Sequence, residues 1–288
     1  MKIKINDEVS RLETVIIGLG IDYGTRDHSI NPIAQKHLEE GTFPFESSIV
    51  NELNCLEYIL LKSGIKVYKP INFKGVMQIF VRDIGFVIED KFFISNMNIK
   101  RGLDEIDGIK HIIDFIPQDN IVENLPKEVM IEGGDVIVAG DNIFIGKSSR
   151  TNDDGFKFIK EYFKNKNVVQ VELDHDPNSE NYALHLDCAF QPISNSAAII
   201  CESSITNPQI IKNYYLNDSL IYVSRLQANR MFTNILSIGE NRIIIEKGFF
   251  ELEHQLLEKG FDVLKVDFKE TSKLGGLLRC STLPLLRS

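Results

Sequence analysis

The stretch Val136-Ile137-Val138-Ala139-Gly140-Asp141-Asn142-Ile143-Phe144-Ile145 decides the fold, because two β-rich runs flank a Gly-Asp-Asn turn. This pattern is typical of a β-hairpin. An amphipathic stretch from Phe156 to Phe163 follows and predicts a helix, and Val168-Val169-Gln170-Val171 predicts a further strand. The sequence therefore contains a unit of hairpin, helix and strand.

The same unit recurs along the chain. Further hairpins are predicted over residues 86–94 and 235–245, and further helices over residues 47–61 and 249–257. Both of these helices end near a glycine that precedes a β-rich run, which is the usual place for a left-handed helix cap. The predicted hairpins open near Glu13, Ile79, Val129, Leu184 and Phe232.

Five such units use the whole chain, residues 1–288, without a linker, and this predicts a single catalytic or binding domain. Small sheets repeated around an axis form a propeller, which leaves no long sheet edge exposed. The predicted fold is therefore α+β, a propeller of repeated hairpin-helix-strand units. A two-domain doubly wound fold is the alternative, although parallel sheets favour single strands that alternate with helices.

The chain has 288 residues, and its 41 acidic side chains outnumber its 32 lysines and arginines, for a formal net charge of −9. An acidic protein repels phosphate backbones, so we expect no nucleic-acid partner and favour a small cationic ligand. Residues 1–6 lack the apolar core of a secretory signal, and no apolar run approaches the ~20 residues of a membrane-spanning helix. We therefore expect no membrane partner.

The cysteines form no C-x-x-C pair. They are Cys55, Cys188, Cys201 and Cys280. Their spacing argues against a disulfide framework and a structural zinc site, and favours a cytoplasmic location. Cys188 and Cys201 lie in strand-like runs, so we expect them to face the core. The sequence leaves the oligomeric state open and allows a homodimer.

Polar clusters interrupt the β-rich runs at similar places in successive units. They are Arg82-Asp83, Glu132-Gly133-Gly134-Asp135, His185-Leu186-Asp187 and the segment 275–282, which contains Cys280. Equivalent positions of a radial repeat converge on its axis, so one pocket would hold carboxylates, an imidazole and a thiol. A thiolate is a nucleophile, an imidazole can act as general acid and base, and carboxylates pair bidentately with planar cations. A guanidinium group, with its electrophilic central carbon, fits this set, and the paired glycines suit a close approach of the backbone to substrate.

Ordered motifs between Val81 and Arg287 resemble those of the guanidino-group modifying enzymes, which include arginine deiminases, dimethylarginine dimethylaminohydrolases and arginine:glycine amidinotransferases. The motifs are Val81-Arg82-Asp83, residues 131–136, residues 145–152, His185-Leu186-Asp187, and the segment from Gly275-Gly276 through Cys280 to Arg287. The resemblance implies a five-bladed α/β propeller, or pentein, with the active site at its centre. This agrees with the number of repeats in the sequence.

The resemblance also implies roles for single residues. Cys280 matches the nucleophile, His185 the general acid and base, and Glu132 the carboxylate that orients the imidazole and contacts the guanidinium. Asp83 and Asp187 match the carboxylates that hold the guanidinium bidentately.

Two arginines match residues that bind the α-carboxylate of an amino-acid substrate. Arg150 lies eighteen positions after Glu132, and Arg101 lies eighteen positions after Asp83. Asp135 belongs to the motif around the paired glycines, and we expect it to order that turn instead of contacting substrate.

Metal binding is not expected. Adjacent strand residues point to opposite faces, so Asp187 and Cys188 would not share one ion. We expect neither a metal nor a cofactor.

The leading hypothesis is a hydrolase that cleaves a C–N bond of arginine or an Nω-methylarginine. A covalent Cys280 thiouronium would form, and water would release a ureido product such as citrulline. An amidinotransferase, in which an amine such as glycine replaces water, is the alternative. A non-catalytic propeller that binds ligands in a relic pocket is the second alternative.

Overall fold

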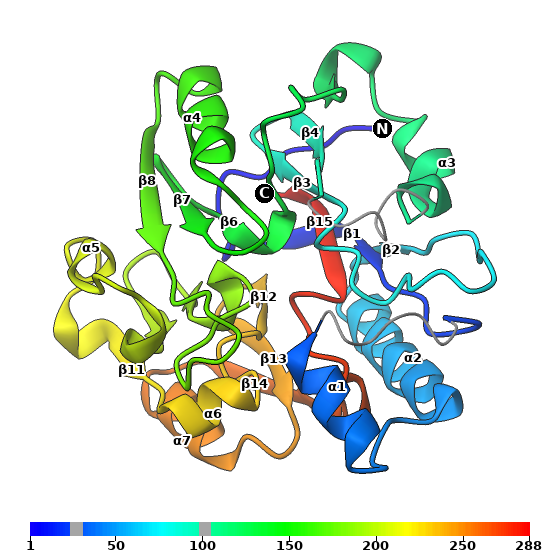
Figure 1. Cartoon of the computed structure of the whole chain (residues 1–288), viewed down its shortest axis with the longest axis vertical. Helices are drawn as coiled ribbons and strands as arrows, with labels where there is room; N and C mark the ends of the chain where they lie inside the picture. The colour runs from blue at the N-terminus through cyan, green and yellow to red at the C-terminus, as the bar shows by residue number, and fades with distance from the viewer. Residues whose placement is uncertain (24–30, 98–104) are drawn as a thin grey trace.

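Five three-stranded sheets are formed by the residues that the computed structural model describes, which are 1–23, 31–97 and 105–288. Their strands are β1 (Leu12–Ile17), β2 (Lys66–Tyr68) and β15 (Thr282–Arg287); β3 (Gly85–Ile88), β4 (Lys91–Ile94) and β5 (Ile121–Val122); β6 (Val136–Ala139), β7 (Asn142–Lys147) and β8 (Asn167–Glu172); β9 (Phe190–Pro192), β10 (Ala198–Ile200) and β11 (Leu220–Tyr222); β12 (Leu236–Gly239), β13 (Arg242–Glu246) and β14 (Asp262–Val266). In each sheet the central strand pairs antiparallel with one neighbour and parallel with the other. The sheets are arranged around a common centre (Figure 1), which confirms the predicted five-bladed α/β propeller.

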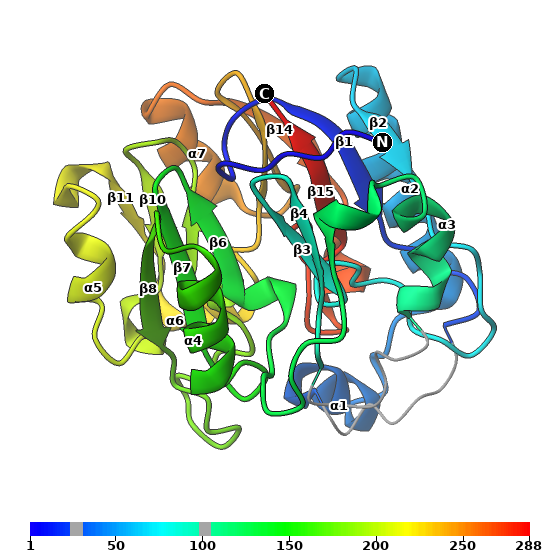
Figure 2. The same cartoon turned by 90° about the horizontal axis from the view of Figure 1, so that it is seen from above.

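Each blade carries a helix between its central strand and its parallel strand. These helices are α2 (Glu46–Lys62), α3 (Lys110–Ile113), α4 (Asp153–Tyr162), α5 (Gln209–Lys212) and α7 (Phe250–Glu258). They lie at the periphery, while β3, β6 and β15 lie toward the centre (Figure 2). Shorter or connecting helices are α1 (Pro32–Glu39), α6 (Arg225–Asn229), α8 (Lys269–Ser272) and the 3-10 helices η3 (Ile106–Ile109), η4 (Gln118–Asn120), η5 (Gly133–Asp135), η6 (Leu186–Cys188), η7 (Glu202–Ser204) and η8 (Asn217–Ser219).

Helix α2 shows why the predicted periodicity is correct. Its apolar stripe of Ile49, Leu53, Leu56 and Leu60 is at most 3% exposed, and burial of each side chain stabilises the fold by roughly 1.5–3 kcal/mol. Gly64 follows the helix at φ +78°, the left-handed conformation that glycine adopts without a steric penalty. No described helix is both long enough and apolar enough to cross a membrane.

The first blade differs from the prediction of a hairpin near Glu13. Strand β1 does not pair with a sequence neighbour, because its antiparallel partner is β15 at the C-terminus, with Leu12 opposite Arg287 and Ile17 opposite Thr282. The hairpin prediction was wrong because the propeller closes by joining its two ends in one sheet. Because of this closure, strand β1 is paired on both sides, with β15 and with β2.

Candidate active site

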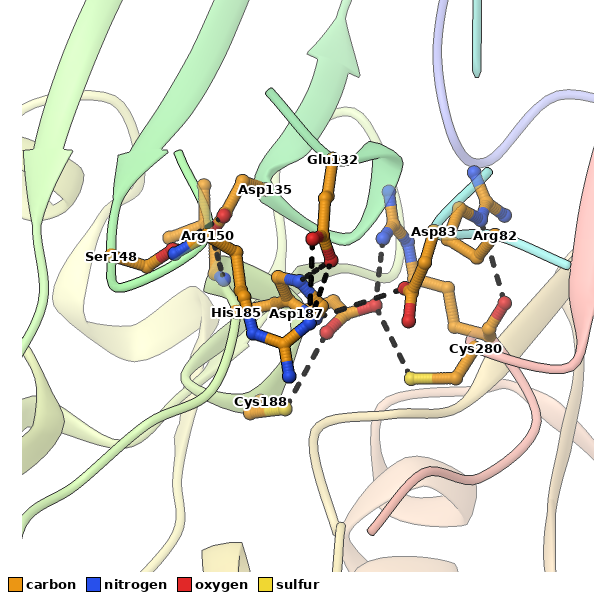
Figure 3. Close-up of polar contacts among 12 residues, drawn as sticks. Arg82, Asp83, Glu132, Asp135, Ser148, Arg150, His185, Asp187, Cys188 and Cys280 are labelled. Atoms are coloured by element: carbon orange, nitrogen blue, oxygen red, sulfur yellow. Dashed lines mark hydrogen bonds and ion pairs between the residues drawn. The ribbon is translucent and has the colours of Figure 1, made fainter. Parts of the chain in front are cut away.

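One polar side chain lies just before the first strand of four blades and before the closing strand of the fifth. These residues are Asp83 before β3, Glu132 before β6, Asp187 before β9, Asn234 before β12 and Cys280 before β15. All are at most 3% exposed. Because these strands share the centre of the propeller, their preceding turns converge there. Figure 3 shows Asp83, Glu132, Asp187 and Cys280 meeting from separate segments of the chain.

The imidazole of His185 is fully buried between two carboxylates. Its Nε2 lies 2.9 Å from Oε2 of Glu132, and its Nδ1 lies 3.8 Å from Oδ1 of Asp83. Burial alone would lower the pKa of His185, but the charges of Asp83 and Asp135 and the hydrogen bond to Glu132 outweigh burial and raise it to about 10. The ring is therefore an imidazolium at neutral pH, ready to donate a proton.

The paired glycines allow this arrangement. A Cβ atom on Gly134 would lie 2.7 Å from Cγ and Nδ1 of His185, and one on Gly133 would lie 2.1 Å from the carbonyl oxygen of Arg82. The sequence predicted that these glycines let the backbone approach the substrate. Their close neighbours in the described structure are the imidazole and the backbone of the Asp83 turn, and the approach to substrate stays a prediction.

Asp135 orders this turn, as predicted. Its Oδ2 accepts a hydrogen bond from the Ser148 hydroxyl at 2.6 Å, and its Oδ1 accepts one from the Leu186 backbone N–H at 2.8 Å. Burial raises the pKa of Asp135 to about 6, although His185 and these hydrogen bonds oppose the shift. Asp135 thus fastens the Glu132 turn to the segment that carries His185.

The thiol of Cys280 faces Asp187, with 3.7 Å between Sγ and Oδ2. The same Oδ2 accepts a hydrogen bond at 2.9 Å from Arg279, whose guanidinium also reaches Glu8 at 2.9 Å. Burial raises the pKa of Cys280 well above its ordinary value, and the negative charge of Asp187 and the neighbouring Cys188 add to this. Without a cation between these groups, Cys280 is a neutral thiol.

Glu8 was not singled out in the sequence. It is 4% exposed and contacts Arg279, the residue before Cys280. Burial alone would raise its pKa, but the charges of Arg279 and Arg82 lower it to about 2. Arg82 lies 3.9 Å from Glu8 and donates to the Thr282 carbonyl at 2.8 Å. The N-terminal segment thereby supports the turns that carry Asp83 and Cys280.

The two predicted carboxylate-binding arginines have different outcomes. Arg150 is 2% exposed, and its Nη1 lies 3.3 Å from Oε1 of Glu132, so it belongs to the buried cluster. Arg101 lies outside the described residues. The role of both arginines toward a substrate remains a prediction.

Cys188 is 5% exposed and belongs to the apolar core, as predicted, but it does not lie in a strand. It ends the 3-10 helix η6, and its Sγ lies 3.5 Å from Oδ1 of Asp187. The argument that residues 187 and 188 face opposite ways fails for the same reason. The segment turns because Asp135 holds the Leu186 N–H in place of a strand partner. Cys201 is fully buried, as predicted.

A pocket of about 720 Å³ reaches Cys188 from the surface. It is lined by α1, by the segment before His185 and by α6. Among its described charged lining residues, Lys36, Arg225 and Arg230 outnumber Glu180. The charged side chains of this wall are therefore mostly positive.

Comparison with known proteins places this site in a family. A family model described as N,N dimethylarginine dimethylhydrolase, eukaryotic, matches residues 27–287. The chain belongs to this family. It is therefore a member of the guanidino-group modifying superfamily, as the sequence motifs predicted.

Relatives of this family member include the uncharacterized protein YkgA of Bacillus subtilis, which is 32% identical over 88% of this chain and 85% of its own. The solved structure of the N-terminal domain of ArgZ, an arginine dihydrolase of cyanobacteria, covalently bound to a reaction intermediate, has a TM-score of 0.81 at 21% identity and covers 95% of this chain and 98% of that one. SxtG, an amidinotransferase of Microseira wollei, has a TM-score of 0.80 at 17% identity and covers 99% and 97%. These two structures share the fold.

Asp83, Glu132 and His185 place one ligand atom each within 4.8 Å of the others, a spacing that could hold a metal ion. However, both ring nitrogens of a protonated imidazole carry hydrogen and offer no lone pair to a metal. In this family member the spacing is accounted for by an imidazolium between two carboxylates.

Proposed function

We propose that this protein is a hydrolase that cleaves a C–N bond of a guanidino amino acid, either arginine or an Nω-methylarginine, and releases a ureido product such as citrulline. The observation that carries the proposal is one buried cluster, in which the Cys280 thiol and the His185 imidazole meet the carboxylates of Asp83, Glu132 and Asp187. Membership in a family named for dimethylarginine hydrolysis supports this reaction class.

Binding of the guanidinium is assigned to Asp83 and Asp187. A planar cation with fixed N–H donors pairs well with carboxylates, and each carboxylate oxygen has two lone pairs. Oδ2 of Asp187 already accepts a hydrogen bond from the guanidinium of Arg279. Its Oδ1 accepts one from the thiol of Cys188, which lines the pocket. A substrate cation between the carboxylates would also offset the negative charge that keeps the Cys280 thiol neutral. The thiol would then release its proton to solvent on binding, since His185 is already protonated.

In the first chemical step, the Cys280 thiolate attacks the central guanidinium carbon and a C–S bond forms. The C–N bond to the leaving amine breaks, and His185 donates its proton to that nitrogen. The products are a neutral amine, a neutral imidazole and a cationic thiouronium on Cys280.

In the second step, His185 accepts a proton from water as the water oxygen attacks the thiouronium carbon. The C–S bond breaks and returns the Cys280 thiolate, a second proton goes to solvent, and the ureido product leaves. Glu132 stabilises the imidazolium in both steps through its 2.9 Å contact. In the rival function, an amidinotransferase, the C–N bond to ornithine breaks in the first step, and an amine takes the remaining amidino group from Cys280.

We also propose that residues 1–288 form one catalytic domain, because Glu8 joins the segment before the family match to the site. Arg150 and Arg101 are proposed to bind the substrate's α-carboxylate. A cytoplasmic location follows from four unpaired thiols, which suit a reducing compartment. A homodimer stays a prediction for sedimentation analysis.

The deciding experiment is mass spectrometry of products from arginine and from Nω,Nω-dimethylarginine, each with and without glycine. Citrulline formed without glycine would support the hydrolase. Ornithine and guanidinoacetate that appear only with glycine would replace it with the amidinotransferase. Failure to consume any guanidino compound would leave the non-catalytic propeller.

Cysteine variants test the nucleophile. Cys280→Ser should reduce turnover by roughly 10⁴-fold or more while leaving the fold intact. Cys55→Ser is the matched control, because Cys55 is exposed and outside the cluster. Rapid denaturation during turnover should yield a peptide containing Cys280 with the added mass of the guanidino amino acid minus its leaving amine, whereas the added mass of an amidino group alone would indicate the amidinotransferase. Undiminished activity of Cys280→Ser would overturn the mechanism.

A further inference from the structure

Asn234 makes two contacts with Cys280. It is fully buried in the turn before β12, at the position where the other blades place Asp83, Glu132 and Asp187. Its Oδ1 accepts a hydrogen bond from the Cys280 backbone N–H at 3.1 Å, and its Nδ2 donates to Sγ of Cys280 at 3.1 Å. One amide group thus holds both the backbone and the sulfur of the same residue.

The chemistry of the partners fixes the orientation of this amide. A backbone N–H can only donate, so the amide oxygen of Asn234 must face it. The NH₂ group is then left facing the sulfur and can only donate to it. In a flipped amide, the NH₂ donor of Asn234 would face the donor N–H of Cys280, and the acceptor oxygen would lie beside Sγ.

The sulfur needs donors because burial and the nearby charges disfavour its thiolate. Asp187 lies 3.7 Å away, Asp83 and Cys188 add to its effect, and the site is buried. Asn234 donates a side-chain hydrogen bond to Sγ, and a backbone hydrogen bond from Leu277 also lowers the pKa of Cys280. Hydrogen bonds to a charged form favour that form.

We propose that Asn234 is a positioning residue that aims the Cys280 sulfur toward the substrate site and stabilises it as a thiolate. This inference rests on the proposed function, in which Cys280 is the nucleophile. The two contacts divide the task. The Oδ1 contact fixes the backbone at residue 280, and the Nδ2 contact fixes the side-chain rotamer and the charge on sulfur.

The test separates these contacts with Asn234→Asp, which keeps an acceptor for the backbone N–H but lacks the N–H donor to sulfur. Asn213→Asp is the control, because it adds the same charge at an exposed helix end. Two quantities are measured: the pH profile of Cys280 alkylation by iodoacetamide with arginine analogue bound, followed at the Cys280 peptide, and kcat with KM.

For Asn234→Asp we expect the alkylation midpoint to rise by about one to two pH units and kcat to fall by about tenfold to a hundredfold, with KM changed less than kcat. Asn213→Asp should match the wild type in both. If Asn234→Asp does not fold, Asn234→Ala removes both contacts without an added charge, and its midpoint should also rise.

An alkylation profile and kcat within twofold of the wild type in a folded variant would overturn the proposal. A lower kcat with an unchanged profile would also overturn it, because the loss would then lie elsewhere than at the sulfur. Failure of the proposed function itself looks different, since the wild type would then release no citrulline from either substrate in the absence of glycine, whatever Asn234 does.

Discussion

Replacement of Gly134 by alanine tests whether the close approach of this backbone to His185 is required for catalysis. The new Cβ would lie 2.7 Å from Cγ and Nδ1 of His185, whereas ordinary van der Waals contact begins near 3.4 Å. The imidazole must therefore move by about 0.7 Å or more. The backbone of residue 134 is held in place, because the carboxylate of the next residue, Asp135, accepts a hydrogen bond from the Leu186 N–H at 2.8 Å.

A shift of this size breaks the alignment of His185 with Glu132 and with the leaving nitrogen. We expect kcat of Gly134→Ala to fall by about tenfold to a hundredfold, and overpacking to reduce the free energy of unfolding by about 1–3 kcal/mol. Steady-state kinetics and urea unfolding measure the two effects. Gly140→Ala is the control: its Cβ meets nothing within 4 Å, so the left-handed φ of +64° should cost about 1–2 kcal/mol of stability and leave kcat unchanged. Wild-type kcat in a folded Gly134→Ala variant would refute the reasoning.

Three further predictions concern charge. NMR of labelled histidine should show His185 protonated up to about pH 10 in the free enzyme, and Glu132→Gln should lower this pKa; a ring that titrates near pH 6.5 would contradict the geometry. Glu8 has a folded pKa of about 2 against an ordinary 4.5, so its ionised form stabilises the fold by roughly 3 kcal/mol above pH 4.5, and this stabilisation is lost as the pH falls toward 2. The free energy of urea unfolding of Glu8→Gln should therefore differ from that of the wild type at pH 7 and differ much less at pH 2. An equal difference at both pH values would contradict the prediction. Alkylation of Cys280 at neutral pH should be slow in the free enzyme and faster with a guanidinium ligand bound. Low reactivity without ligand therefore does not indicate a relic site, whereas a thiol that stays unreactive with the ligand bound would indicate one.

Local patterns in the sequence predicted most of the fold. The hairpin expected from residues 136–145 is observed as β6 and β7, and the helix expected over residues 47–61 is observed over Glu46–Lys62. Both depend on side-chain periodicity and turn residues, which act over a few positions. The pairing of β1 with β15 joins the two ends of the chain, and no periodicity within a short window encodes that partnership.

The site was predicted where residues are chemically conspicuous. His185, Glu132 and Cys280 belong to motifs, and the structure brings them into one cluster. Asn234 was missed because an amide has no charge and no nucleophile, although its place before the fifth hairpin was a signal that the repeat could have given. Glu8 was missed because its importance comes from a contact with Arg279, 271 positions away.

Cys188 shows the limit in the other direction. Its apolar neighbours predict a strand, yet the segment forms η6, because a hydrogen bond from Leu186 to Asp135 holds the backbone. Tertiary contacts of this kind override local propensity, and here they bring a second thiol beside Asp187.

The closing strand β15 also has a temporal consequence. Cys280 precedes it by two residues, so the proposed nucleophile reaches the cluster only when β15 docks on β1. Before this docking, the carboxylates and the imidazole lack the Cys280 thiol. Catalytic competence therefore arrives together with closure of the ring, and turnover reports that β15 has docked on β1.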